Sequence, residues 1–428
     1  MRGTYLIMSI SHFTIRQITK TVKIMQKYFI LILTIFFISC VNQQNKNSHF
    51  TKEQITSLHL DSTKILNIET DSVIKVDMNQ FLKKQTFDFG SLVKEVKLIP
   101  LETTDESLLD NILKILVTDS NIYIYDDFKG GGIVIFNNKG KFIKRIPYGQ
   151  GPGELYKLDD IDFDKDKNEL VAYQHPFLLF YTASGEFVRH QRLPFGFFNF
   201  TIIPDGYVFK TIDRDGNEHL GHLEDFTLLV TDKNFKVESV GLPTFPRDIH
   251  FGGYNYLYKN NTIKVTQNLT DTIFQYISGT DQLKVKYVLD YSKKKIPEQY
   301  LLVSHSEFKN ITKHNDYYFY IGQYLETESQ NVFFLENAYI GTQTIVYRDK
   351  KSGSLRGGTN ADFNQNEIPP IAFPKAAYGN YFISSYLPSK KDSFLSKSSI
   401  ISSEDKLKVK GLIEDDNPVL VFYKLKNF

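Results

Sequence analysis

The residues best suited to chemistry in this chain are acids, arginines and histidines that follow short apolar strands. Because each lies where a predicted strand ends or a crossing begins, we expect one loop face to collect Asp126, Asp127, His175, Asp213, Arg214, Asp215, Arg247 and His250. Mixed acids, arginine and histidine around a pore are typical of a site for a polar ligand. Loops are also polar because they face water, so the pattern predicts a binding face and does not identify the ligand.

A second candidate is the glycine-rich stretch that reads Gly149-Gln150-Gly151-Pro152-Gly153-Glu154. A dinucleotide-binding loop needs a different glycine spacing and a helix that directs its first amides at the phosphate. Here Pro152 lacks an N–H, and the chain after Leu155 is strand-like. We therefore interpret the stretch as a structural crossing between repeats, in which Glu154 and the backbone amides are candidate ligand contacts.

Local motifs for metal binding and catalysis fail on spacing. The stretch from Asp162 to Asp166 begins like a calcium loop, but Lys167 and Tyr173 occupy the positions that need Gly and Glu, so we interpret it as a hairpin. His219 and His222 lack the glutamate of a zinc-binding helix, and no Gly-x-Ser-x-Gly elbow occurs. Carboxylates that converge from distant strands leave no local motif. A calcium-dependent hydrolase or lyase acting on a sugar or lactone therefore stays open as the alternative function, and no other cofactor is predicted.

The only cysteine, Cys40, follows an apolar run at residues 28–38, which is shorter than the roughly 20 residues of a membrane-spanning helix. Lysines precede this run, as in a secretory signal. Phe37-Ile38-Ser39-Cys40 resembles a bacterial lipobox, which implies cleavage before Cys40 and acylation of that residue. A plain signal peptide with an incidental cysteine is the alternative.

These features predict a signal peptide at residues 1–39, of which residues 1–24 are an over-long start before Met25. Residues 40–90 are expected to hold the lipidated cysteine, a polar tether and a lead-in to the folded domain. Since the tether has no acidic cluster, we expect an outer-membrane lipoprotein that faces the periplasm.

The composition sets limits on the function. Hydrophobic residues make up 41% and charged residues 23% of the chain, which excludes global disorder. A net charge of +2 argues against a nucleic-acid-binding protein. The 35 phenylalanines and 26 tyrosines favour strands over helices, and a single cysteine excludes intrachain disulfides and multi-cysteine metal sites.

Strands recur in units of about 40–50 residues, which is typical of propeller blades. Gly140-Lys141-Phe142 recurs as Gly185-Glu186-Phe187, and one strand of each of six units starts at Asn121, Glu169, Gly206, Asn255, Asn331 and Asn380. The longest interval contains an insertion near residues 296–320, with a short helix that begins after Pro297. A strand at residues 93–101 is expected to pair with residues 419–423 and close the ring, so the all-β, six-bladed propeller spans residues 91–428.

Three stretches together resemble the six-bladed β-propeller lipoproteins of Gram-negative bacteria, whose shape is related to NHL-repeat propellers. These stretches are Ile99-Pro100-Leu101-Glu102-Thr103, Gly140-Lys141-Phe142 and the glycine-rich sequence at residues 149–154. The resemblance covers roughly residues 90–428 and implies the fold. That family has no established general activity, so the resemblance leaves the function open.

We therefore predict a lipid-anchored cell-envelope propeller that acts as a non-catalytic binding or scaffold module. Its partner is expected to be a protein, a peptide or a glycan. We expect a monomer that contacts the membrane through its lipid anchor only and does not bind nucleic acid.

Overall fold

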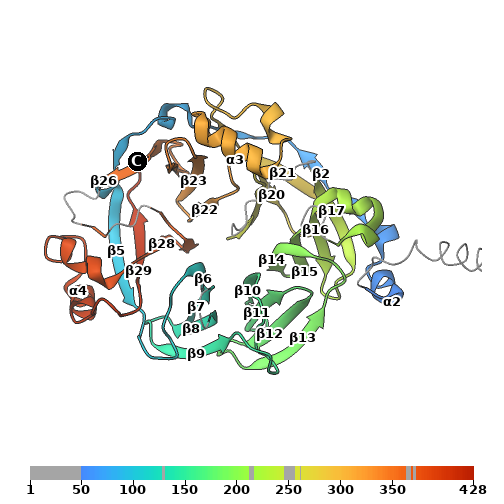
Figure 1. The fold of residues 1–428 in the computed structure, drawn as a ribbon, viewed down its shortest axis with the longest axis horizontal. Helices are drawn as coiled ribbons and strands as arrows, with labels where there is room; N and C mark the ends of the chain where they lie inside the picture. The colour runs from blue at the N-terminus through green and yellow to red at the C-terminus, as the bar shows by residue number, and fades with distance from the viewer. Residues whose placement is uncertain are drawn as a thin grey trace, which may run out of the picture. The chain divides into compact units, whose positions relative to one another are not determined.

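The computed structural model describes residues 50–127, 131–211, 216–244, 256–260, 262–362, 368–369 and 373–428. Lys52–Phe428 forms one compact unit, and the following description concerns that unit. Its described strands form six blades around a central axis, as Figure 1 shows. The structure therefore confirms the six-bladed β-propeller predicted from the repeats.

The first three blades follow one another along the chain, each an antiparallel meander that starts at the centre and ends at the rim. Blade 1 contains β6 (Ile112–Val117), β7 (Asn121–Asp126), β8 (Gly132–Asn137) and β9 (Phe142–Pro147). Blade 2 contains β10 (Asp160–Asp164), β11 (Glu169–Gln174), β12 (Phe177–Thr182) and β13 (Phe187–Arg192). Blade 3 contains β14 (Phe197–Ile203), β15 (Gly206–Thr211), β16 (Phe226–Asp232) and β17 (Val237–Pro243).

The other three blades have the same order of strands, and the last one borrows its outermost strand from the N-terminal part of the chain. Blade 4 contains β18 (Leu257–Lys259), β19 (Ile263–Val265), β20 (Thr272–Tyr276) and β21 (Gln282–Asp290). Blade 5 contains β22 (Tyr324–Glu326), β23 (Gln330–Asn337), β24 (Thr342–Asp349) and β25 (Leu355–Gly358). Blade 6 contains β27 (Ala376–Tyr378), β28 (Tyr381–Tyr386), β29 (Val419–Leu425) and β5 (Val93–Pro100).

The sequence of each strand reflects its radial position. The second strand of blade 1, β7, is buried along its whole length, because neighbouring blades cover both of its faces. Such a strand has a continuous apolar run instead of an alternating pattern. The outermost strand of blade 2, β13, has an exposed or half-buried residue at every position and carries two arginines and a histidine. Charge on an outer strand discourages edge-to-edge pairing with other chains.

The hydrophobic core of the ring is divided among the boundaries between blades. In the described residues, one buried cluster fills each of the six boundaries, including the one between blade 6 and blade 1. A seventh cluster lies beneath the insertion between blades 4 and 5. Each blade is thus held mainly by its two neighbours, and the inner strands are left to line a central channel.

The pairing of β5 with β29 closes the ring. The two strands are antiparallel, with Leu98 opposite Val421, and Figure 1 shows them side by side in light blue and red. This confirms the predicted closure, which removes the open edges that a linear array of blades would have.

The chain before β5 follows the outer rim of the ring instead of forming only a tether and lead-in. Its first strand, β1 (Lys64–Ile65), pairs with β17 at the edge of blade 3. The next two, β2 (Asn67–Glu69) and β3 (Ile74–Asp77), pair with β21 at the edge of blade 4. The fourth, β4 (Thr86–Asp88), pairs with β26 (Asn360–Asp362), which follows blade 5. All four pairings are parallel. We call residues 52–90 the strap, which appears in blue along the rim in Figure 1. The compact unit begins at Lys52 and therefore includes the strap.

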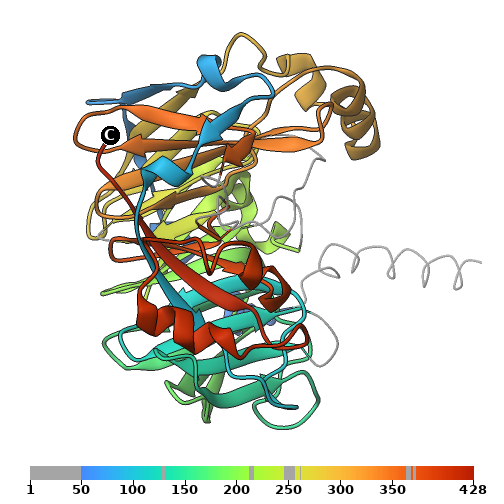
Figure 2. The ribbon, with the colours of Figure 1, turned by 90° about the vertical axis from the view of Figure 1, so that its left-hand side faces the viewer.

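Three α-helices lie outside the blades in the described residues. They are α2 (Lys52–Thr56), α3 (His305–His314) and α4 (Ser403–Lys410). Short 3-10 helices occupy Leu60–Ser62, Asn79–Phe81, Gly90–Leu92, Glu218–Asp225, Glu298–Leu301 and Pro388–Ser393. The expected insertion near residues 296–320 contains α3, whose first turn is capped by the Ser304 side chain. The sequence analysis missed α4, which lies on the outer side of β5 in Figures 1 and 2.

One repeat assignment was off by one strand. The stretch that begins at Asn255 corresponds to β18, the innermost strand of blade 4, whereas its counterparts in the other blades are second strands. The second strand of blade 4, β19, has only three residues, so its signal in the sequence is weaker than that of the second strands of the other blades, which have six to eight. Tyr256, Leu257 and Tyr258 form a short aromatic and apolar run like that of a second strand, which explains the shift.

Candidate functional site: the central channel

The inner strands enclose a central cavity of about 1160 Å³. Its wall includes residues from the first strand of every blade: β6, β10, β14, β18, β22 and β27. Concave sites on proteins commonly occupy about 300–1,000 Å³, so this channel has room for a ligand of several rings or residues. The wall contains side chains of both charges, together with tyrosines and phenylalanines.

Carboxylates on β10 accept hydrogen bonds from the backbone of β14, the innermost strand of the next blade. Asp160 accepts a hydrogen bond from the backbone N–H of Phe200 at 3.0 Å, and Asp162 accepts one from the N–H of Ile202 at 2.8 Å. These N–H groups lie on the free edge of β14, where no further strand can pair with them. An unpaired buried N–H is costly, so the two aspartates stabilise the channel wall.

Asp160 is also paired with a lysine of blade 1. The Lys114 ammonium lies 2.6 Å from Asp160 Oδ1 and donates a second hydrogen bond, 2.8 Å long, to the carbonyl of Ile161. The carboxylate is only 2% exposed. Burial raises the pKa of Asp160, and the nearby ammonium opposes that rise. The inner strands of blades 1, 2 and 3 are thus joined through one side chain.

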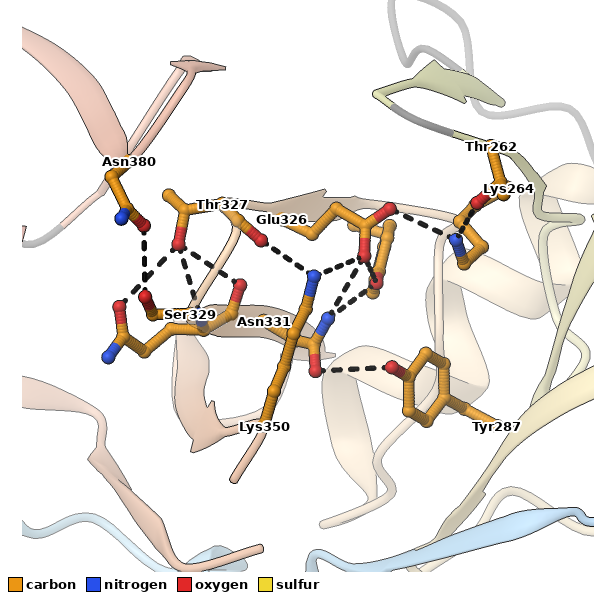
Figure 3. Close-up of polar contacts among 11 residues, drawn as sticks. Thr262, Lys264, Tyr287, Glu326, Thr327, Ser329, Asn331, Lys350 and Asn380 are labelled. Carbon is orange, nitrogen blue, oxygen red and sulfur yellow. Dashed lines mark hydrogen bonds and ion pairs between the residues drawn. The ribbon is translucent and has the colours of Figure 1, made fainter. Parts of the chain in front are cut away.

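A second charged network lies where blade 5 meets blade 4, and Figure 3 shows its hydrogen bonds. The Glu326 carboxylate accepts from Lys264 Nζ at 3.0 Å and from Lys350 Nζ at 2.8 Å. Tyr324 also donates its hydroxyl hydrogen to Glu326 Oε2 at 3.0 Å, and Asn331 donates an amide hydrogen to the Tyr324 hydroxyl at 2.7 Å. The Glu326 carboxylate and the Tyr324 hydroxyl thus have their partners within the protein.

Burial and the two lysines shift the pKa of Glu326 in opposite directions. Burial alone would raise the pKa of Glu326, but the ammonium groups of Lys264 and Lys350 outweigh it and hold that pKa below its usual value. Burial lowers the pKa of Lys264, and Glu326 offsets this only in part. The network is a structural ion triad at the channel wall, so its carboxylate is not available as a base.

Another part of the wall has charged groups that no opposite charge neutralises in the described residues. At the end where the inner strands begin, Lys375 donates only to the carbonyl of Ile112, at 3.2 Å. Asp127 is exposed and accepts a long hydrogen bond from the Tyr125 hydroxyl, at 3.4 Å. Phe373 exposes 45% of its surface at the same end of the channel. These groups are the ones that a ligand can reach.

Three of the predicted loop-face residues lie in the described part of the chain, and only one of them, Asp127, lines the channel. Asp126 is 1% exposed, and its carboxylate accepts from the backbone N–H groups of Asp110 and Asn111, so the protein's own backbone occupies it. His175 is exposed on blade 2, and its ring nitrogen Nδ1 is 3.0 Å from the Tyr173 hydroxyl, away from the channel wall. The remaining members of the set lie outside the described residues, as does Cys40: Asp213, Arg214, Asp215, Arg247 and His250.

The glycine-rich stretch at residues 149–154 folds around its own glutamate. Glu154 Oε2 accepts a 2.7 Å hydrogen bond from the backbone N–H of Gly151. A Cβ on Gly149 would lie 2.0 Å from the same oxygen, and Gly153, with φ of +77°, packs against the Phe187 ring. The geometry agrees with a structural crossing between blades 1 and 2, and Glu154 does not line the channel.

Most of the charged residues that line the channel were not among the predicted site residues, for example Lys114, Asp160, Asp162, Glu326 and Lys375. For β10 a signal was present, since Asp160, Asp162 and Asp164 alternate with apolar residues. Such alternation places all three on one face of a strand. The last of them closes the predicted hairpin, because its carboxylate accepts from the N–H groups of Asp166 and Lys167.

The alternative with calcium needs several carboxylates that converge from different blades. Within the described part of the chain, no group of three or more His, Cys, Asp or Glu residues is arranged to hold a metal ion. The carboxylates of Asp160, Asp162 and Glu326 are each bonded to protein groups instead. No helix among the described residues is both long and apolar enough to cross a membrane.

Comparison with known proteins agrees with this fold. A family model described as a domain of unknown function, DUF4934, matches residues 18–424. The chain belongs to the DUF4934 family. No curated protein matches this DUF4934 chain.

Among solved structures, this DUF4934 protein is similar to an exported protein of Bacteroides fragilis. The two share 18% identity with a TM-score of 0.67, and the match covers 83% of this chain and 100% of the other. A protein of unknown function from Bacteroides caccae matches 62% of this chain and 92% of its own length, at 11% identity and a TM-score of 0.35. The similarity to the Bacteroides fragilis protein supports the propeller fold and shows nothing about function.

Proposed function

We propose that this protein is a cell-envelope binding module whose ligand occupies the central channel, and that it does not carry out catalysis. The observation that supports this best is that the channel wall has two kinds of groups, some bonded within the protein and others accessible. The buried acids Asp160 and Glu326 are bonded within the protein, while Asp127, Phe373 and Lys375 at one end are accessible. Bonded carboxylates stabilise a wall, and accessible groups of mixed chemistry can recognise a polar ligand.

The partner is a protein segment, a peptide or a glycan small enough to enter the channel. Localisation to the cell envelope is supported by the exported Bacteroides fragilis neighbour. The finer proposal is an outer-membrane lipoprotein that faces the periplasm and is anchored through Cys40. Its test is membrane fractionation of the wild type and Cys40→Ser, since loss of the acyl chains should move the protein from the membrane to the soluble fraction.

A binding screen tests the role of the channel. The wild-type protein is applied to arrays of immobilised oligosaccharides and of peptides, beside Leu113→Trp and Leu302→Trp. Leu113 is 41% exposed and lines the channel, so a tryptophan there narrows it, whereas Leu302 is 66% exposed outside it. We expect binding by the wild type and Leu302→Trp and its loss in Leu113→Trp at an unchanged melting temperature. Equal binding by all three would contradict the proposal.

A further inference from the structure

Phe373 and Lys375 form one accessible patch on the channel wall of blade 6. They lie two residues apart just before β27, and hydrogen bonds to β28 fix their backbone: Lys375 N–H donates to the Ile383 carbonyl, and the Ser384 hydroxyl donates to the Phe373 carbonyl. Both residues line the cavity and both are exposed.

Lys375 differs from two other lysines of the wall. Lys114 lies 2.6 Å from Asp160, and Lys157 lies 3.3 Å from Asp159. In the described residues, no carboxylate lies within ion-pair distance of Lys375, whose ammonium donates to the Ile112 carbonyl. Partial burial of the ammonium lowers the pKa of Lys375. A bound anion would supply the opposite charge that the described residues do not provide.

Phe373 offers a flat apolar surface beside that ammonium. A phenylalanine with 45% of its surface exposed in a concave wall can be covered by a ligand, and covering it is favourable. A group that combines a carboxylate with a ring of C–H bonds can therefore contact Lys375 and Phe373 together.

Other groups of the wall limit the ligand further. Asp127 and Asp159 lie on the walls of blades 1 and 2, and Gln323 lies on that of blade 5. The two carboxylates would repel a polyanion or a densely acidic peptide, but they accept hydrogen bonds from hydroxyl groups. These groups favour a ligand that is rich in hydroxyls and carries an isolated carboxylate.

We propose that the channel binds an acidic oligosaccharide through one uronic acid unit. The carboxylate of that unit pairs with Lys375, its ring packs on Phe373, and hydroxyl groups of the chain donate to Asp127 and Asp159. This inference rests on the proposed binding function and specifies the ligand class of the same channel. It assigns no reaction to the protein.

The test uses as its probe an oligosaccharide of neutral sugars that carries one galacturonic acid unit, and the same oligosaccharide with that carboxyl group reduced is the neutral counterpart. Calorimetric titration is performed with the wild type, Lys375→Gln, Lys375→Arg and Phe373→Ala. The matched control is Lys313→Gln, which removes an exposed lysine of α3 outside the channel. Since Lys375 makes no ion pair with described residues, Lys375→Gln should keep the wild-type melting temperature.

We expect the acidic probe to bind the wild type and Lys313→Gln with equal affinity. The affinity should fall at least 10-fold in Lys375→Gln and in Phe373→Ala, and Lys375→Arg should retain most of it. Reduction of the carboxyl group should cause the same loss, and added salt should weaken binding of the acidic probe only.

Two results would overturn the inference and have different meanings for the proposed function. If the neutral probe or a peptide from the array binds, and Leu113→Trp abolishes that binding while Lys375→Gln does not, the channel is a binding site for another ligand class. If the acidic probe binds equally to the wild type, Lys375→Gln and Leu113→Trp, its site lies outside the channel, and both proposals fail.

Discussion

Lys114 and Asp160 form an ion pair across the boundary between blades 1 and 2, with the ammonium nitrogen 2.6 Å from a carboxylate oxygen. The carboxylate is 2% exposed and also accepts the N–H of Phe200 in blade 3. Removal of one partner of a buried pair leaves the other charge uncompensated, which costs about 3–5 kcal/mol. Lys114→Met should lower the free energy of unfolding by that amount in urea titrations at pH 7, while Lys313→Met should leave it unchanged.

The pH dependence of the same variant gives an independent check. Without Lys114, the buried carboxyl of Asp160 gains stability by taking up a proton, because burial raises its pKa. The stability difference between the wild type and Lys114→Met should therefore shrink as the pH falls from 7 toward 5. A difference that stays constant over this range would show that Asp160 is not the residue left uncompensated.

Replacement of Lys210 in blade 3 by methionine should stabilise the protein, in contrast to the loss of stability expected for Lys114→Met. It is 4% exposed, and its ammonium donates to the Thr227 hydroxyl rather than to a carboxylate. Burial lowers the pKa of Lys210 to about 7. Lys210→Met should raise the free energy of unfolding at pH 7 by about 1–2 kcal/mol, since it removes a poorly solvated amine.

The sign of the pH effect at Lys210 follows from the lowered pKa. Between about pH 7 and pH 10.5 the unfolded chain binds a proton that the folded protein does not, so wild-type stability rises with pH in this window. The advantage of Lys210→Met should decrease from pH 7 to pH 9. The exposed residue Lys233 is the control: Lys233→Met should show no advantage at either pH.

The crossing at residues 149–154 predicts a non-additive pair of substitutions. Gly149→Ala places a methyl group where Glu154 Oε2 lies, at 2.0 Å, and should destabilise the protein by about 1–3 kcal/mol. Glu154→Ala alone removes the acceptor for the Gly151 N–H, at a cost of about 1 kcal/mol. The double variant should lose less than the sum of the two, because the oxygen that clashes is gone. Additive losses in chemical denaturation would argue against this packing.

The strap predicts that a protein beginning at residue 91 is unstable. Leu66, Val76, Met78 and Phe81 of the strap are each at most 7% exposed, and burial of each such side chain contributes about 1.5–3 kcal/mol. Removal of residues 52–90 also exposes the outer edges of blades 3 and 4. Size-exclusion chromatography and thermal unfolding should show aggregation or a greatly lowered melting temperature, whereas a protein beginning at residue 50 should be a stable monomer. Equal stability of the two would show that the strap is dispensable.

The repeats and the closing strand could be predicted because they depend on local patterns. Turn glycines and apolar runs such as residues 133–136 mark each blade, and the match between residues 93–101 and 419–423 follows from the need to pair both ends. The strap was missed as a set of strands because β1 to β4 have only two to four residues each. Strands this short carry little periodicity, and their parallel partners lie far away in the chain.

The channel residues were harder to predict than the fold. Glu326, Lys264 and Lys350 come from three strands or turns of two blades, so no spacing in the sequence links them. Selecting acids and histidines from loops found Asp127, but it also selected Asp126, whose carboxylate is bonded to its own backbone neighbours. The predicted site residues all came from loops, whereas many of the charged residues of the channel wall lie on the innermost strands.

The most direct test of the account is the position of the ligand on the protein. Hydrogen exchange is measured by mass spectrometry with and without the oligosaccharide that carries one galacturonic acid unit, or with the strongest binder from the arrays. The account predicts that protection is confined to the inner strands and their adjoining loops, above all to β6, β10 and the segment that leads into β27. Protection confined to the outer strands β9 and β13, with no change along the channel wall, would contradict it.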